Sequence, residues 1–149
     1  MREFLAIENA VIAALTSISG IKTLDAYSGQ LEVAELDELT LQFPCVYVVC
    51  EQLDLKTVNR YDDMTVRFSL FVGDRNVRGA KAAARGDASS PGVYELLHLS
   101  RNAIHRRPLV AGWSAPELTG VRPLVYAPKI SVCLYEANYT LKAARLPNT

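Results

Sequence analysis

Hydrophobic positions near the start of the chain recur at helical spacing. Five apolar side chains fall three or four residues apart: Phe4, Ile7, Val11, Leu15 and Ile18. Side chains at this spacing share one face of an α-helix. The pattern predicts an amphipathic helix over residues 2–18 that ends near Gly20, because glycine commonly follows the last turn of a helix. Leucines recur among acids in residues 31–42, which predicts a second, acidic helix.

The next two segments have the patterns of β-strands. Six apolar residues in a row, from Cys45 to Cys50, are typical of a strand buried on both faces. Residues 64–72 alternate instead, and their apolar members share one face: Met64, Val66, Phe68, Leu70 and Val72. The connection at residues 56–63 has the size of a hairpin turn. We therefore expect these two strands to pair antiparallel.

The rest of the chain continues the alternation of helices and strands. Four segments follow in order: a weak helix at 78–85, a loop at 86–92, a helix at 93–106 and a connection rich in proline and glycine at 108–123. Residues 124–141 then close the fold with a strand, and the tail at 143–149 is expected to be mobile. This order predicts one α/β (α+β) domain over residues 1–149, with a mixed sheet of about four strands flanked by helices.

Composition predicts a globular chain with no general affinity for nucleic acid or membrane. Half of the 149 residues are hydrophobic and 21% are charged, which is ordinary for a soluble domain and too hydrophobic for a disordered one. Sixteen basic and sixteen acidic residues cancel, so we expect no net attraction to DNA or anionic lipid. No apolar run approaches the length of a membrane span.

The three cysteines, Cys45, Cys50 and Cys133, lie inside apolar runs. An odd number of cysteines in strand-like segments argues against a disulfide framework and for a reducing compartment. Cys45 and Cys50 are five residues apart, so on a strand they point to opposite faces and cannot form a metal clip. We expect three core cysteines in a cytoplasmic protein.

The cancelling charges are distributed unevenly along the chain. Residues 25–63 hold nine acids and two bases, while residues 75–107 hold seven bases and two acids. Both segments could simply supply solvated faces. Alternatively, an acidic face of one copy meets the basic face of the next copy. Such a head-to-tail contact closes into a ring when the rotation between copies permits it.

No group of residues has the spacing of a known catalytic or cofactor site. The basic segment lacks the Gly-Lys-Ser/Thr of a Walker loop and the GxGxxG of a dinucleotide fingerprint. His98 and His105 are seven residues apart, too far to share a metal without a third element. No GxSxG elbow surrounds Ser89 and Ser90. We predict that the chain is not an enzyme and needs neither a cofactor nor a metal.

Three residues in loops are candidates for contacts with other molecules. Asp62 and Asp63 fall where the hairpin turns, and turn geometry alone can explain aspartates there. Trp113, in the AGWSAP loop, is interpreted as an interface anchor. The tyrosines fall mostly in predicted strands and helices, where they are expected in the core or in subunit contacts.

Four stretches follow one another in an order that is characteristic of one family: TLDAYSGQL, FPCVYVV, FSLFVGDRN and RGAKAAARGDASSPGVYELL. With them, the chain resembles the tail-terminator (tail-completion) proteins of Mu-like phages and related prophages. The resemblance extends from AIENAVIAAL in the first helix to ISVCLYEANYTL in the last strand. Two departures lie in loops: Ser28 stands in an expected Tyr-Gly-Gly turn, and Asp87 stands where glycine is common.

The resemblance implies structural work without turnover. Proteins of this kind look like one α/β domain that forms a six-fold ring on the finished tail tube. The ring stops tube polymerisation, caps the sheath of a contractile tail and offers a surface to the neck proteins that join the head. The expected partners are further copies of the chain, a tail tube protein, a tail sheath protein and neck or head-completion proteins, in a virion tail assembled in the host cytoplasm.

We predict that residues 75–92 make contacts in such a ring. This basic, glycine-rich segment has few apolar residues with which to order itself, so we expect it to be partly mobile until it meets the tube, the sheath or the next subunit. The predicted interface residues are Arg75, Arg78, Lys81, Arg85, Trp113, Asp62 and Asp63. Three alternatives stay open: another connector or neck protein, a basic loop that contacts DNA in the ring channel, and a small cytoplasmic enzyme.

Overall fold

The computed structural model describes residues 2–31, 43–76, 78–127, 131–143 and 146–147. The elements are α1 (Arg2–Leu15), β1 (Thr23–Ala26), β2 (Cys45–Val58), β3 (Tyr61–Arg75), α2 (Ala80–Arg85), α3 (Val93–Ile104), β4 (Glu117–Ala127), β5 (Val132–Lys142) and β6 (Leu146–Pro147). The predicted first helix is confirmed, although it ends at Leu15, and Ile18 beyond it still packs against the core. The predicted acidic helix lies outside the described residues, apart from Leu31.

The described strands form one mixed sheet in the order β1-β2-β3-β5-β4. β1 runs parallel to β2, while the other neighbouring strands are antiparallel, including the predicted pair β2 and β3. The short strand β6 pairs with β3 at the hairpin, beside Tyr61 and Asp62. The predicted α+β fold with a mixed sheet flanked by helices is confirmed, but the sheet has more strands than the four expected.

β4 is the strand that the sequence pattern concealed. It begins at Glu117, inside the segment predicted to be a connection, and continues past Pro123. Gly120 and Pro123 both lie at register shifts against β5, and β4 is the last strand of the described sheet. Proline is compatible with an edge strand because one side of its backbone needs no ladder hydrogen bond. The glycine and the proline that indicated a connection therefore flank two β-bulges.

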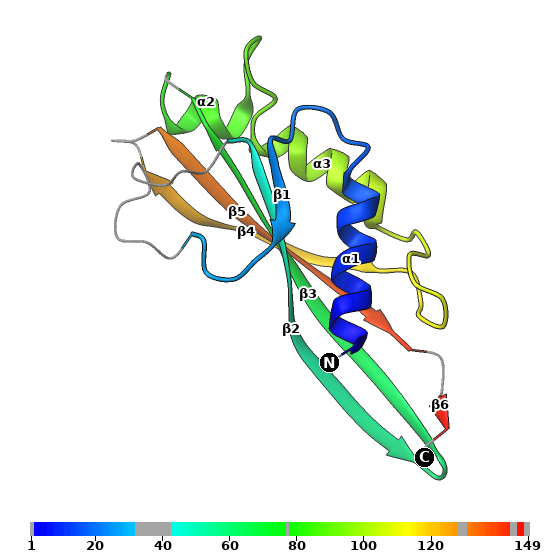
Figure 1. Ribbon diagram of the computed structural model, residues 1–149. Coiled ribbons are helices and arrows are strands. Elements are labelled where there is room, and N and C mark those ends of the chain that lie inside the picture. The colour runs from blue at the N-terminus through cyan, green and yellow to red at the C-terminus, as the bar shows by residue number, and fades with distance from the viewer. Residues whose placement is uncertain (1, 32–42, 77, 128–130, 144–145, 148–149) are drawn as a thin grey trace.

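The three described helices pack against the same face of the sheet. α1 contacts β2, α3 contacts β3 and β5, and α2 contacts β5 and α3, as Figure 1 shows for α1 and α3. Alternate residues of the central strands point into this layer: Val46, Val48, Cys50, Val66, Phe68, Leu70, Val72, Cys133, Ala137, Tyr139 and Leu141. The opposite face, which carries Tyr47, Ser69 and Glu136, has none of the described helices on it. We call it the open face.

The β2–β3 hairpin extends beyond β1, β5 and β4 (Figure 1). β1 pairs with β2 only from Cys45 to Val48, whereas β2 continues to Val58. Leu146–Pro147, in the tail that we expected to be mobile, pair with the first two residues of β3 near the hairpin turn. Part of the tail therefore has a defined strand partner.

The three cysteines are free and buried, as predicted. Cys50 and Cys133 belong to the core beneath the helices, and Cys45 lies on the open face. Burial raises the pKa of the Cys45 thiol to about 12, so this thiol stays protonated at neutral pH and is a poor nucleophile. None of the described helices is long and apolar enough to cross a membrane.

Candidate assembly surfaces

Residues 74–92 form a loop and a short helix that are organised around two aspartates. Asp74 lies near the end of β3 and is 1% exposed. Its carboxylate accepts hydrogen bonds from the Ser90 hydroxyl, from Gly92 N–H at 3.1 Å and from Arg75 N–H at 2.8 Å. Burial raises the pKa of Asp74, and these hydrogen bonds oppose the rise. The carboxylate ties the far end of the loop back to β3.

Asp87 organises the turn in the middle of the loop. Its Oδ1 accepts hydrogen bonds from Ser89 N at 2.8 Å, Ser89 Oγ at 2.7 Å and Ser90 N at 3.1 Å. Asn76 Nδ2 donates to the second carboxylate oxygen at 2.9 Å, and Arg78 Nε lies 3.8 Å from that oxygen. Hydrogen bonds from Ser89 and Asn76 hold the pKa of Asp87 well below its usual range. An ionised carboxylate therefore fixes this turn.

Two glycines allow the ends of the loop to meet. Gly86 and Gly92 both have a φ of 80°, a conformation that residues with a Cβ rarely adopt. A Cβ on Gly86 would lie 2.1 Å from the Pro91 carbonyl oxygen, and a Cβ on Gly92 would lie 2.3 Å from Gly86 N. The obstructing atoms belong to the backbone and cannot move aside, so both positions require glycine.

Residues 75–92 have more buried contacts than their few apolar residues suggested. Three alanines of α2 are buried: Ala80, Ala83 and Ala84. Together with the hydrogen bonds of Asp74 and Asp87, they hold the described residues of this segment against the rest of the same copy, whereas its mobility in solution stays a prediction. The signals were present in the sequence, because an alanine can fill a small space under a helix and an aspartate two residues before a serine favours an Asx turn.

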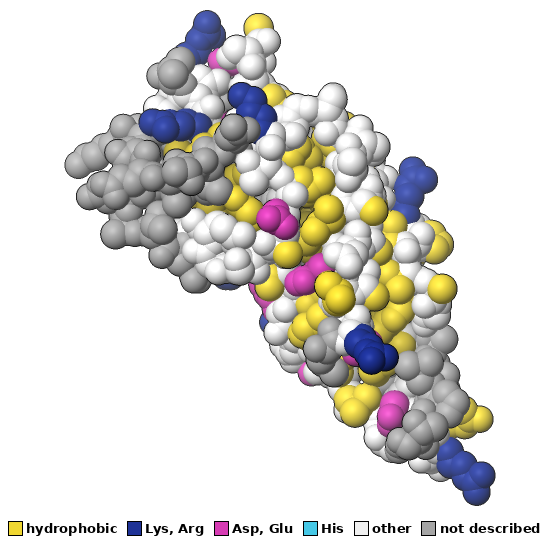
Figure 2. Space-filling view, in the orientation of Figure 1, with side chains coloured by type: hydrophobic (Ala, Val, Ile, Leu, Met, Phe, Trp, Pro, Cys, Tyr) yellow, Lys and Arg dark blue, Asp and Glu magenta, His cyan; other side chains and the backbone are white. Residues whose placement is uncertain are grey.

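The four predicted basic residues, Arg75, Arg78, Lys81 and Arg85, are all exposed, and we call them the basic end. Lys81 and Arg85 are four residues apart on α2, so they lie on one side of the helix. Figure 2 shows Lys and Arg side chains gathered at the end of the molecule that carries α2. A hollow of about 330 Å³ lies beside them, lined in part by Lys22, Arg75 and Asn76.

Asp62 and Asp63 lie at the start of β3, beside the hairpin turn, as predicted. Asp62 accepts a hydrogen bond from the Thr57 hydroxyl at 2.8 Å. Figure 1 places this turn and α2 at opposite ends of the molecule, so one copy does not bring the two aspartates and the basic end together. Four acids of the predicted acidic face lie outside the described residues: Glu32, Glu35, Asp37 and Glu38.

Trp113 lies on the connection between α3 and β4 and is partly buried. Its side chain packs against the hydrophobic core, and its backbone forms a bridge with Ala143. The Ala143 N–H in turn donates to the Met64 carbonyl in β3, so Trp113 belongs to the part of the molecule at the base of the hairpin. Its use as an interface anchor stays a prediction.

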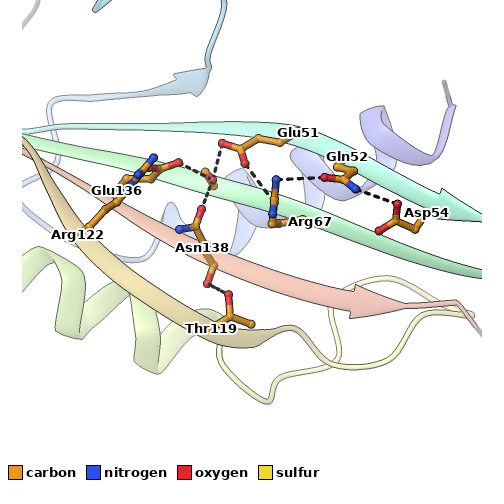
Figure 3. Close-up of polar contacts among 9 residues, drawn as sticks. Glu51, Gln52, Asp54, Arg67, Thr119, Arg122, Glu136 and Asn138 are labelled. Carbon is orange, nitrogen blue, oxygen red and sulfur yellow. Dashed lines mark hydrogen bonds and ion pairs between the residues drawn. The ribbon is translucent and has the colours of Figure 1, made fainter.

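A polar cluster on the open face was not anticipated from the sequence. Its members come from four strands: Glu51, Arg67, Ser69, Arg122, Glu136 and Asn138 (Figure 3). Ser69 is fully buried at its centre. The Ser69 hydroxyl oxygen lies 2.7 Å from Glu51 Oε1, 3.2 Å from Glu136 Oε1 and 2.7 Å from Asn138 Oδ1. A hydroxyl has one proton to donate, so these oxygens compete for it.

Two arginines compensate the carboxylates of the polar cluster. Arg122 Nε donates to Glu136 Oε2 at 2.7 Å, and Arg67 Nε lies 3.4 Å from Glu51 Oε2. Burial opposes ionisation of Glu136, but hydrogen bonds from Arg122 and Ser69 outweigh it and lower the pKa of this carboxyl. The cluster therefore links β2, β3, β5 and β4 through side chains. Its signal in the sequence is the polar alternation of Glu136 and Asn138 within an otherwise apolar strand.

The two histidines make separate local contacts. His98 Nε2 lies 3.2 Å from Asn102 Nδ2 on α3, and His105 Nδ1 accepts a hydrogen bond from Leu118 N–H at 2.9 Å. Within the described ranges, no group of three or more histidine, cysteine, aspartate or glutamate side chains could hold a metal ion. The absence of a metal, a cofactor and an enzymatic activity stays a prediction.

These observations define an α+β protein whose distinctive surfaces are an exposed basic end, a long hairpin and an ion-paired open face. The particular relationship comes from comparison with known families. The chain belongs to the family described as Bacteriophage Mu, Gp37, whose model matches residues 3–128. This confirms the predicted relationship to proteins of Mu-like phages.

A solved structure with the same fold comes from a virion. It is a chain from the virion of a native gene transfer agent (GTA) particle, with 13% sequence identity and a TM-score of 0.57. The alignment covers 93% of this chain and 94% of that chain. At this identity the likeness shows a shared fold alone. No curated protein matches the chain.

Proposed function

We propose that this protein is a structural component of a phage tail, and that six copies form the ring that ends the tail tube. The observation that carries the proposal is the match of the Bacteriophage Mu, Gp37 family to residues 3–128. The virion origin of a chain with the same fold supports a place in a particle. The ring would stop polymerisation of tube and sheath and offer a surface to the neck proteins.

The basic end is the surface that we assign to contacts with tube, sheath or neck proteins. Arg75, Arg78, Lys81 and Arg85 are exposed on a loop that is already fixed by Asp74 and Asp87, so little conformational entropy is lost when a partner binds. Exposed ion pairs contribute only about 0–1 kcal/mol each. Six copies of several pairs would act together through avidity.

Tail length separates a terminator from a connector or neck protein. Phage particles produced without this chain are expected to carry tubes of excessive and variable length, because nothing stops polymerisation. Electron microscopy of tails with and without the chain measures this directly, and expression of the wild-type chain in trans should restore one length. Tails of normal, uniform length that fail to join heads would overturn the terminator proposal in favour of a connector.

A second candidate function is a contact between the basic end and DNA in the ring channel. The exposed arginines are the one observation that favours it. Binding of duplex DNA by the purified protein, measured at several salt concentrations, tests it. Affinity that falls steeply with salt would support phosphate contacts. No binding at low salt would exclude them.

A further inference from the structure

Exposed apolar side chains concentrate at two edges of the described sheet. Six large hydrophobic side chains are exposed in the described part of the chain: Leu5, Leu55, Tyr61, Tyr94, Val121 and Leu124. Three of them lie on edge strands, since Leu55 belongs to β2 and Val121 and Leu124 belong to β4. Leu55 is 58% exposed and Val121 is 46% exposed. Exposed apolar groups gathered in this way mark surfaces that meet other proteins.

The first edge is the outer side of β2 in the hairpin. Past Val48, where the pairing with β1 ends, no described strand lies beside this side of residues 49–57. The strand contains no proline and no glycine from Cys45 to Val58. The strand has one bulge, at the register shift between Cys50 and Gln52, and beyond it residues 52–57 present a row of backbone N–H and C=O groups that can pair with another strand.

The second edge is β4, at the other side of the sheet. Its register shifts near Gly120 and Pro123 interrupt the ladder with β5, and bulges of this kind redirect side chains. The edge therefore offers short stretches of backbone and two outward apolar side chains, Val121 and Leu124, in place of a continuous ladder. This edge differs from the β2 edge, so the two can meet without pairing either edge with itself.

The two edges carry complementary side chains on each face of the sheet. Leu55 is level with Met64 and Val121 is level with Ala137, which places both apolar side chains on the face that carries the helices. Asp54 and Arg122 both lie on the open face, where Figure 3 shows them. When two sheets lie side by side with the same face outward, apolar meets apolar and carboxylate meets guanidinium.

Strand direction and stagger fit the same arrangement. β4 runs opposite to β5 and β2 runs parallel to β5 within one copy, so a rotation that preserves strand direction makes β4 antiparallel to β2 of the next copy. With β2 paired to β4 of the next copy, the four strands β2, β3, β5 and β4 repeat about every 19 Å. A strand tilt of about 45° then offsets neighbouring copies by about 19 Å, or roughly six residues, which the overhang of the hairpin beyond β1 can accommodate.

We propose that copies of this chain associate edge to edge, with the outer edge of β2 in one copy lying antiparallel along β4 of the next. Leu55 packs against Val121 on the helix-covered side, and Asp54 faces Arg122 on the open side. The number of copies rests on the ring of the proposed function, whereas the contact itself does not. The basic end is left outside this contact and remains available to other proteins of the tail.

Disulfide trapping tests the contact directly. The variant Leu55→Cys with Val121→Cys is expected to form a ladder of covalent multimers on mild oxidation. Within one copy the two positions are separated by β3 and β5, about 14 Å at least, which is too far for an internal disulfide. The matched control pairs Leu5→Cys with Val121→Cys, because Leu5 is as exposed (61%) but lies on α1. The native cysteines are buried, and the wild type provides their background.

Light scattering of the purified protein provides the second measurement. The wild type is expected to have a mass of several copies that persists at high salt, and Leu55→Asp to reduce it to that of one copy while Leu5→Asp leaves it unchanged. A wild type that is a monomer, a ladder no stronger than in the control, or an unchanged mass in Leu55→Asp would each overturn the edge contact. Tail length in the absence of the chain tests the terminator role separately, so either proposal can fail alone.

Discussion

Gly86 and Gly92 lie against each other at the point where the basic loop closes, and each has a φ of 80°. The loop carries the exposed arginines, so the position of those charges depends on two residues that carry no charge. Asp74 and Asp87 fix the remaining geometry through hydrogen bonds to Ser90, Gly92 and Ser89. A change at the glycines should therefore reach the basic surface through the backbone.

Gly92→Ala is expected to lower the free energy of unfolding by about 2 kcal/mol or more. Its Cβ would lie 2.3 Å from Gly86 N, and backbone strain at such a φ costs on the order of 1–3 kcal/mol. Urea denaturation measures the change. Gly120→Ala is the control, because nothing lies within 4 Å of its Cβ position, and it should stay within about 0.5 kcal/mol. Equal stabilities of the two variants would show that the loop is not closed as described.

At the scale of elements, the sheet depends on a buried hydroxyl between strands. Ser69→Ala is expected to destabilise the fold by about 1–3 kcal/mol, because it removes the buried hydroxyl that lies between Glu51, Glu136 and Asn138 and leaves the buried Glu136 with one donor fewer. Thermal or urea unfolding measures the loss. Thr119→Ala is the matched control, since the Thr119 hydroxyl donates to the Asn138 carbonyl at 3.1 Å on an exposed edge. A cost no larger than that of the control would contradict a structural role for the polar cluster.

Element patterns predicted the fold wherever one face of a strand or helix is clearly apolar. The alternation from Met64 to Val72 and the run from Cys45 to Cys50 yielded the central hairpin, and helical spacing yielded α1 and α3. β4 could not be predicted in this way, because Gly120 and Pro123 read as turn residues until their partner strand is known. The length of the hairpin was also hidden, since residues 56–63, most of which are polar, were predicted to be the connection although all but Asn59 and Arg60 belong to the strands.

The charges of the candidate contact residues could be predicted from the sequence, but the surfaces that these residues form could not. The exposure of Arg75, Arg78, Lys81 and Arg85 follows from their charge, whereas the frame that holds them depends on Asp74, which is distant in sequence from the Ser90 and Gly92 groups that it binds. The polar cluster joins residues from Glu51 to Asn138 across four strands, and no local pattern contains that information. Register, which only the folded sheet defines, brings them together.

At the scale of the whole molecule, the basic end should act in assembly and not in folding. Reversal of Arg78 and Arg85 to Glu is expected to change the free energy of unfolding by only about ±0.5 kcal/mol per site, because both side chains are exposed. It should nevertheless weaken tail capping, seen by electron microscopy as tails of uneven length. Arg2→Glu with Arg106→Glu changes the net charge equally at exposed positions elsewhere and serves as the control. Normal capping by the variant with Arg78→Glu and Arg85→Glu would show that the basic end takes no part in tail capping.

The basic end and the hairpin lie at opposite ends of each copy (Figure 1). Copies joined side by side with their strands in one direction would all place α2 toward one rim and the hairpin turn toward the other. The two rims of such a ring would differ in chemistry, so only one of them could bind a given surface. The shape of one subunit would then determine the direction in which later components are added to the ring.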